Sequence, residues 1–197
     1  MKGEPDAALY DLRKQSLALL EKSSEKGEID LYYGDESHVC EEGYVPYGWQ
    51  FKDEKVVVPV AKGKKLNCFG LLSRQNDLIF NTTPENIDAD FILQQLENLS
   101  RNIRKQTVVV LDNATVHVAK KIKERFNCWQ ERGLYIFYLP PYSPHLNIIE
   151  RLWKELKARW LRPSDYQSAD QLFYATRLAL ATVGNQLNIN FGRFNYH

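Results

Sequence analysis

The stretch Leu139–Glu150, LPPYSPHLNIIE, constrains this chain more than any other segment. Its three prolines fix the backbone φ angle and remove amide donors, so the first part of the stretch is a stiff loop. The apolar spacing that follows is typical of one face of a helix and predicts a helix over residues 146–161. A stiff loop that runs directly into a helix holds one carboxylate, Glu150, near the start of that helix.

Two further carboxylates follow apolar runs with the composition of strands. Asp35 comes after the run 29–34, and Asp112 comes after a run of β-branched and leucine residues at 108–111. Three acidic groups at the ends of core elements suit an oxygen-ligand site for two divalent metal ions. We therefore take Asp35, Asp112 and Glu150 as candidate catalytic residues and metal ligands.

The periodicity of the chain predicts antiparallel strands first and alternating strands and helices afterwards. This order favours an α/β fold with a mixed sheet flanked by helices. The expected helices cover residues 6–26, 87–103, 115–130, 146–161 and 168–186; the expected strands cover 29–34, 56–58, 66–72, 78–81, 107–111 and 134–139, with a loop over 40–50.

Composition places the chain among globular proteins. At 197 residues, with 44% hydrophobic and 12% aromatic residues, it is long and apolar enough to bury one sizeable core. It has no run of 18 apolar residues, which argues against a membrane span, and its N-terminus lacks the apolar segment of a secretory signal. Its three widely spaced cysteines fit neither a disulfide framework nor a zinc site, so we expect a cytoplasmic protein.

Positive charge is concentrated around the second and third carboxylates. The whole chain has a net charge of +1, yet residues 119–163 contain ten Lys and Arg residues against four acidic ones. This distribution favours a surface that holds a DNA backbone. A solvated face on two helices is the alternative.

These residues together resemble the DDE transposases of the mariner superfamily, in their bacterial insertion-sequence branch. The matching features are Asp35-Glu36, Asp112-Asn113 with His117, and the stretch from Pro140 to Glu150. The stretch departs from the pattern of the family at two positions, with Ile148 in place of Pro and His145 in place of an acidic or amide residue. If Asn147 caps the helix, Ile148 is its first residue, where Pro is favoured but dispensable.

The resemblance implies an RNase H-like fold of the retroviral-integrase type. It also implies two Mg²⁺ ions, with Mn²⁺ as a substitute, held by Asp35, Asp112 and Glu150. The implied reaction is metal-dependent cleavage at the DNA ends of an insertion sequence, followed by strand transfer into target DNA. The implied partners are double-stranded DNA, namely transposon ends and target, and further copies of the chain in a dimer or larger assembly, with no membrane; the setting is the DNA-associated bacterial cytoplasm.

We expect three parts along the chain: a linker-like helix over 1–28, the DDE catalytic domain over 29–165, and a helical tail packed on it over 166–197. The family normally reads its terminal repeats with helix-turn-helix units that precede the catalytic domain. Such units are expected here as a separate partner or as an N-terminal half joined by frameshifting.

Several side chains have a purely structural interpretation beside the functional one. Asp35 and Asp112 could simply end strands, and Glu150 could complete a capping box with Asn147. Lys154 and Lys157 lie on one helical stripe with Glu150, where they could hold phosphates or only pair with it. The expected DNA contacts are Lys154, Lys157, Arg151, Lys120 and His117.

Two other functions compete with transposition. One is a stand-alone RNase H-like nuclease or resolvase, which would share the acidic site. The other is a decayed, non-catalytic remnant that only binds DNA. Joining of one DNA end to another separates the first from a transposase, and metal binding separates the second.

Overall fold

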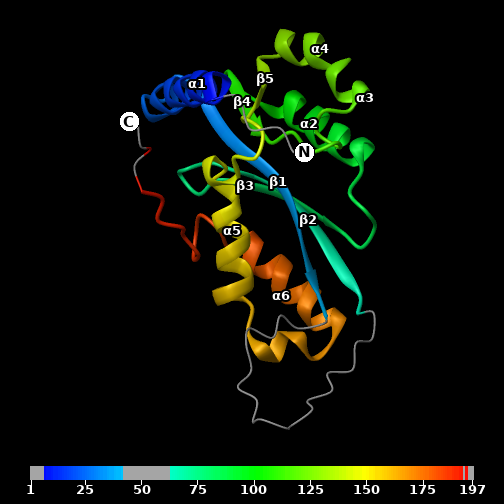
Figure 1. The fold of residues 1–197 in the computed structure, drawn as a ribbon. Coiled ribbons are helices and arrows are strands. Elements are labelled where there is room, and N and C mark those ends of the chain that lie inside the picture. The colour runs from blue at the N-terminus through cyan, green and yellow to red at the C-terminus, as the bar shows by residue number, and fades with distance from the viewer. Residues whose placement is uncertain (1–6, 42–62, 193, 195–197) are drawn as a thin grey trace.

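The computed structural model describes residues 7–41, 63–192 and 194, which form one five-stranded sheet with helices on both faces (Figure 1). The predicted strand over 56–58 and most of the predicted loop over 40–50 lie outside these residues. The strands are β1 (Asp30–Cys40), β2 (Lys65–Leu72), β3 (Leu78–Thr83), β4 (Thr107–Leu111) and β5 (Leu134–Tyr138). The α-helices are α1 (Ala7–Glu25), α2 (Ala89–Asn102), α3 (Lys120–Lys123), α4 (Phe126–Glu131), α5 (Ile149–Glu155) and α6 (Ala169–Ala181); the other helical turns are η1 (Pro144–Leu146), η2 (Leu156–Trp160) and η3 (Pro163–Gln167).

The strand order is β3-β2-β1-β4-β5, which places β1 in the centre of the sheet with β4 beside it. The strands β1, β2 and β3 form antiparallel pairs, whereas β4 runs parallel to β1 and β5 runs parallel to β4. This is the mixed sheet that the order of elements predicts. The carboxyl ends of β1, β4 and β5 therefore point in one direction.

Each face of the sheet has its own hydrophobic core, because successive side chains of a strand point to opposite faces. Leu31 and Tyr33 of β1 pack in the core that includes residues of α1, α5 and α6. Tyr32 packs in the other core, with residues of α2, α3 and α4. Figure 1 shows α2, α3 and α4 gathered near one end of the sheet, with α5 and α6 lying farther along it.

A buried ion pair attaches α1 to the centre of the sheet. Glu21 is 1% exposed and accepts hydrogen bonds from the hydroxyl group of Tyr33 and from Nε of Arg74, which lies 2.7 Å from both carboxylate oxygens. The charge of Glu21 is thus neutralised where water cannot reach it. This contact holds α1 against β1, two residues before Asp35.

Two predicted elements are wrong in their extent. Strand β1 does not end at Gly34 but continues to Cys40, because β2 keeps pairing with it as far as Lys65. The predicted helix over 115–130 is instead a turn followed by the short helices α3 and α4. The carboxylate of Asp112 accepts a hydrogen bond from the amide of Ala114 at 2.9 Å, and such a local bond favours a turn over a helix.

The predicted helix over 146–161 also differs from the structure. It begins later, with α5 at Ile149, and its last turn, η2, is a π-helix. The structure contains no helix long and apolar enough to span a membrane, as far as residues 7–41, 63–192 and 194 are concerned.

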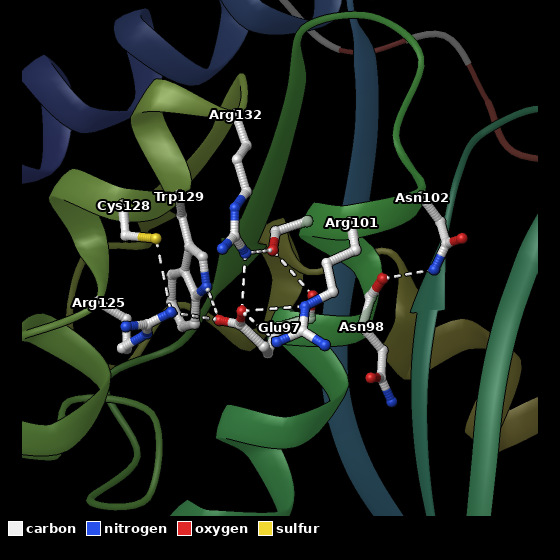
Figure 2. A network of polar contacts seen from close by, with 9 residues as sticks. Glu97, Asn98, Arg101, Asn102, Arg125, Cys128, Trp129 and Arg132 are labelled. Atoms are coloured by element: carbon white, nitrogen blue, oxygen red, sulfur yellow. Dashed lines mark hydrogen bonds and ion pairs between the residues drawn. The ribbon is translucent and has the colours of Figure 1, made fainter.

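The side chain of Glu97 on α2 links this helix to α4 (Figure 2). Its carboxylate accepts hydrogen bonds from Nε1 of the buried Trp129 at 2.9 Å, from Arg125 at 3.0 Å and from Arg132 at 2.7 Å, and it also pairs with Arg101. The hydrogen bonds from Arg132 and Trp129 lower the pKa of Glu97 well below its usual range. This network fixes the helices on the face of the sheet opposite to α5.

We predict that Glu97→Ala lowers the free energy of unfolding by roughly 2–4 kcal/mol, because the buried indole of Trp129 loses its acceptor and three arginines lose their shared carboxylate. Urea unfolding of the two proteins measures this difference. The control is Glu124→Ala, which removes an exposed pair with Lys120 at 3.8 Å and should change stability by less than about 0.5 kcal/mol. Equal effects of the two substitutions would contradict a structural role for the network.

Candidate active site

Asp35 and Asp112 occupy matching positions on the two neighbouring central strands. Tyr33 of β1 pairs with Val110 of β4 in parallel register, and each aspartate comes two residues later. Because side chains alternate, both aspartates point to the same face as Tyr33 and Val110, which pack in the core that contains α5. Asp35 lies within β1, whereas Asp112 is the first residue after β4.

Glu150 reaches this place because α5 packs very closely on the sheet beside Asp35. The residue of β2 paired with Asp35 is Gly70. A Cβ atom on Gly70 would lie 3.1 Å from Cδ1 of Ile149 and 3.2 Å from Cη2 of Trp153, so only a residue without a side chain allows this approach without displacement. Ile149 and Trp153 are buried in the contact, and Glu150 lies next to them on the exposed side of α5.

The negative charges around Asp35 act on one another. The pKa of Asp35 is raised from 3.8 to about 7, first by burial and then by the charges of Glu36, Glu150 and Asp112. Burial by itself raises the pKa of a carboxyl group, and neighbouring carboxylates raise it further. The structure therefore brings the three candidate carboxylates within electrostatic reach of one another.

His117 lies between Asp112 and Glu36. Its Nδ1 donates a hydrogen bond to Oδ1 of Asp112 at 2.7 Å, and its Nε2 lies 2.9 Å from Oε2 of Glu36 in an ion pair without hydrogen-bond alignment. Burial lowers the pKa of His117, but the contacts with the two carboxylates outweigh burial and raise it to about 9. The imidazolium in turn lowers the pKa of Asp112. At neutral pH, His117 is thus an internal cation that keeps Asp112 ionised.

The expectation that His117 contacts DNA does not fit its surroundings, because its side chain is completely buried. Only the contact with Asp112 could be expected from the sequence, because His117 follows Asp112 by five residues. The contact with Glu36 depends on the pairing of β1 with β4 and was missed. Glu36 points to the face opposite to Asp35, where His117 can reach it.

The loop from Leu139 to Pro144 borders a cavity of about 480 Å³ that also touches Asp112, Asn147 and Glu150. Tyr142, at the tip of the loop, has a φ of 57° and is 70% exposed. A positive φ is uncommon for a bulky residue and persists only when the surrounding structure enforces it. Here three prolines flank Tyr142 and restrict the rest of the loop.

The carboxylate of Glu150 is not used in a helix cap. The prediction that Asn147 is the N-cap is wrong. The N-cap of α5 is Ile148, which makes no side-chain capping hydrogen bond. The side chain of Asn147 instead donates a hydrogen bond from Nδ2 to the carbonyl of Gly34 at 3.2 Å. The capping-box interpretation of Glu150 is therefore excluded, and its carboxylate is left available to a ligand.

The expected DNA contacts differ in where the structure places them. Arg151 and Lys154 are exposed and border a second cavity of about 480 Å³ together with Glu150. Lys157 has a pKa that burial lowers, while the charges of Cys68, Glu150 and Asp35 act to raise it, so this ammonium group is within reach of the carboxylates. Lys120 is 91% exposed on α3 and pairs with Glu124.

The donor set suits two divalent cations. Within the described ranges, no three side chains of His, Cys, Asp or Glu converge as ligands of one ion. A two-ion site does not require this, since Mg²⁺ takes only one or two carboxylates and keeps waters or substrate oxygens as its other ligands. Three carboxylates would supply ligands for such a pair, and a cation would offset the negative charge that, together with burial, raises the pKa of Asp35.

Comparison with known proteins gives three kinds of match. Residues 30–173 match the DDE superfamily endonuclease family. The chain is 24% identical over 186 residues to an uncharacterized 39 kDa protein of the insertion element IS630 from Shigella sonnei, covering 91% of this chain and 53% of that protein. It is 28% identical over 87 residues to the uncharacterized protein y4pE/y4sA of Sinorhizobium fredii, covering 43% of this chain and 60% of that protein. The chain thus spans less than two thirds of the length of these relatives.

Among solved structures, the chain resembles the Mos1 transposase in a paired-end complex with the left transposon end. The TM-score is 0.59 at 17% identity, with 94% of this chain and 62% of that chain covered. It also resembles the catalytic core domain of BIV integrase, with a TM-score of 0.50 at 16% identity and coverage of 80% of this chain and 85% of that chain. These likenesses concern the fold, and they confirm the predicted RNase H-like architecture of transposase and integrase catalytic cores.

We predict that Asp35→Asn stabilises the metal-free protein at pH 8 but not at pH 4.5. The folded protein holds the proton of Asp35 up to a pKa of about 7, whereas the unfolded chain releases it near 3.8. Stability therefore falls as the pH rises between these values, and the full cost, on the order of 1–3 kcal/mol, is present above pH 7. An uncharged amide at this position avoids that cost.

The measurement is urea unfolding in EDTA at both pH values. Asp11→Asn removes the same charge from an exposed position on α1 and serves as the control. If Asp35→Asn destabilised the protein equally at pH 4.5 and pH 8, the carboxylates would not be interacting as described.

Proposed function

This chain belongs to the DDE superfamily of endonucleases, and we propose from this premise that it is the catalytic domain of an insertion-element transposase. One observation carries the proposal. Asp35 within β1 and Asp112 directly after β4 lie in matching register on the two central parallel strands, and α5 holds Glu150 over the same face. The likeness to the insertion-element protein of Shigella sonnei supports transposition over other uses of this fold.

Asp35, Asp112 and Glu150 are the residues that would hold two divalent cations, Mg²⁺ or Mn²⁺. When bound, such ions stabilise charge on the attacking and leaving oxygens of a phosphodiester and help to activate the nucleophile. Asp112 is ready to act as a ligand because His117 keeps it ionised. Asp35 must lose its proton before it can bind a cation. Because its pKa is about 7, binding of a divalent cation should strengthen as the pH rises through 7.

The proposed reaction has two steps of the same chemical type. In the first, a water oxygen forms a bond to phosphorus while the bond from phosphorus to the 3′ oxygen breaks, leaving a 3′-hydroxyl and a 5′-phosphate. In the second, this 3′-hydroxyl forms the new bond to a phosphorus of the target strand, and the 3′ oxygen of the target leaves. Both nucleophiles are hydroxyl oxygens, so one arrangement of carboxylates serves both steps.

The proposed substrate is double-stranded DNA, comprising the ends of the element and the target. Arg151 and Lys154 adjoin Glu150 on α5, and Lys157 lies within reach of Glu150 and Asp35. Cations at these positions suit contacts with the phosphates on either side of the reacting bond, and such contacts position the duplex without reading its sequence. Lys120 would act farther away, along the same basic region.

We assign recognition of the terminal repeats to a helix-turn-helix partner or N-terminal half, and pairing of two ends to a dimer or larger assembly. The Mos1 structure that the chain resembles is a paired-end complex, which supports such an assembly here. The chain on its own should accordingly bind DNA in a salt-sensitive manner with little sequence preference.

We predict that the chain nicks supercoiled plasmid DNA in Mn²⁺, and that Asp112→Asn lowers the rate by about a hundredfold or more, since one metal ligand is lost. The control is Asp30→Asn, which removes a carboxylate from the other end of β1, where it pairs with Lys105 at 3.0 Å. This control should retain nearly the full rate.

Joining of an oligonucleotide with a free 3′-hydroxyl to the plasmid then distinguishes the candidate functions. Joined products indicate a transposase, and nicking without joining indicates a stand-alone nuclease. If both activities were absent although Mn²⁺ binds, the catalytic proposal for this chain would be wrong.

A further inference from the structure

The loop between β5 and α5 is fastened at both ends by side-chain amides. At its start, Nδ2 of Asn113 donates a hydrogen bond to the carbonyl of Leu139 at 2.6 Å. At its end, Nδ2 of Asn147 donates to the carbonyl of Gly34 at 3.2 Å. Asn113 directly follows Asp112, and Gly34 directly precedes Asp35, so each amide bond lies next to a carboxylate of the candidate site.

Both amides complete strand pairing at the point where it stops. The pairing of β1 with β4 ends at Tyr33, and Asn147 of the loop donates to the carbonyl of the next residue of β1, Gly34. The pairing of β5 with β4 ends at Tyr138, and Asn113 likewise supplies a donor to the next carbonyl, that of Leu139. A buried carbonyl without a partner is costly, and both bonds avoid this cost.

Hydrogen bonds within the loop make it stiff, so the two fastened ends also fix the position of Glu150. The amides of Leu146 and Asn147 bond to the carbonyls of Ser143 and Pro144 at 3.1 and 2.9 Å, and the amide of Glu150 bonds to the carbonyl of Asn147 at 3.3 Å. Asn147 is only 5% exposed. Two hydrogen bonds thus connect Asp35 to Glu150. The side chain of Asn147 bonds to Gly34, which precedes Asp35, and the carbonyl of Asn147 accepts from the amide of Glu150.

We propose that Asn113 and Asn147 are positioning residues that set the separation of Asp35, Asp112 and Glu150 by fastening the loop to both central strands. The Nδ2 atom of each amide is already bonded to a backbone carbonyl, so the proposed effect on the site runs through the loop. This inference rests on the proposed function, because it concerns how the three carboxylates act together on metal ions. It assigns to the two amides a role beyond local stability.

The test compares three substitutions that each remove one amide bonded to a backbone carbonyl. Asn147→Ala and Asn113→Ala release the loop, whereas Asn67→Ala, the matched control, removes a buried amide that donates to the carbonyl of Glu85 at 2.7 Å. Calorimetric titration with Mn²⁺ on the whole chain should show about tenfold or greater weakening for the first two, as is typical when groups that orient metal ligands are lost. The control should lose stability but keep its Mn²⁺ affinity within about twofold.

Hydrogen exchange provides a readout that needs neither metal nor DNA. In Asn147→Ala the amides of Glu150 and Arg151 should exchange faster, and in Asn67→Ala they should not. If exchange at these amides stayed unchanged, or if all three variants weakened Mn²⁺ binding equally, the positioning role would be overturned. A wild-type chain that binds no Mn²⁺ but shows the expected exchange would contradict the proposed function and leave the fastening of the loop supported.

Discussion

The packing of α5 against Gly70 is the contact on which the rest of the site depends. Gly70 pairs with Asp35 across β1 and β2, and the missing side chain lets Ile149 and Trp153 reach the sheet at this point. A Cβ atom there would force the side chains of Ile149 and Trp153 to shift by a few tenths of an ångström, against the close packing that brings Glu150 to the two aspartates. The parallel register of β1 and β4 places Asp35 and Asp112 in matching positions on the same face.

This arrangement gathers negative charge at a cost to stability. Burial and then the charges around Asp35 raise its pKa to about 7, which means that the folded protein is more stable when this group is neutral. The structure offsets part of the cost with His117, a buried cation between Glu36 and Asp112. One aspartate is therefore kept ionised and the other is held near its titration point, a division typical of sites in which neighbouring carboxylates have different tasks.

Much of this could be predicted from the sequence, and the errors have physical causes. Strand β4 was predicted with its correct limits, because an uninterrupted β-branched run has few alternatives. The end of β1 and the bond of Asn147 were not, because each depends on a partner distant in sequence, namely β2 and Gly34. The turn after Asp112 was missed because a local hydrogen bond from the amide of Ala114 to Asp112 favours a turn over the helix that the periodicity predicts. The candidate carboxylates followed from a motif, whereas the contact of Glu36 with His117 and the close approach of α5 to Gly70 became visible only in the structure.

The central claim is that Asp35, Asp112 and Glu150 act together as one site for two metal ions. Electron paramagnetic resonance of the chain titrated with Mn²⁺ tests it most directly, because two ions that share a carboxylate are magnetically coupled. We expect two coupled ions for each chain, and loss of the coupling in Asp35→Asn. A signal from isolated ions only, or one that Asp35→Asn leaves unchanged, would contradict the account.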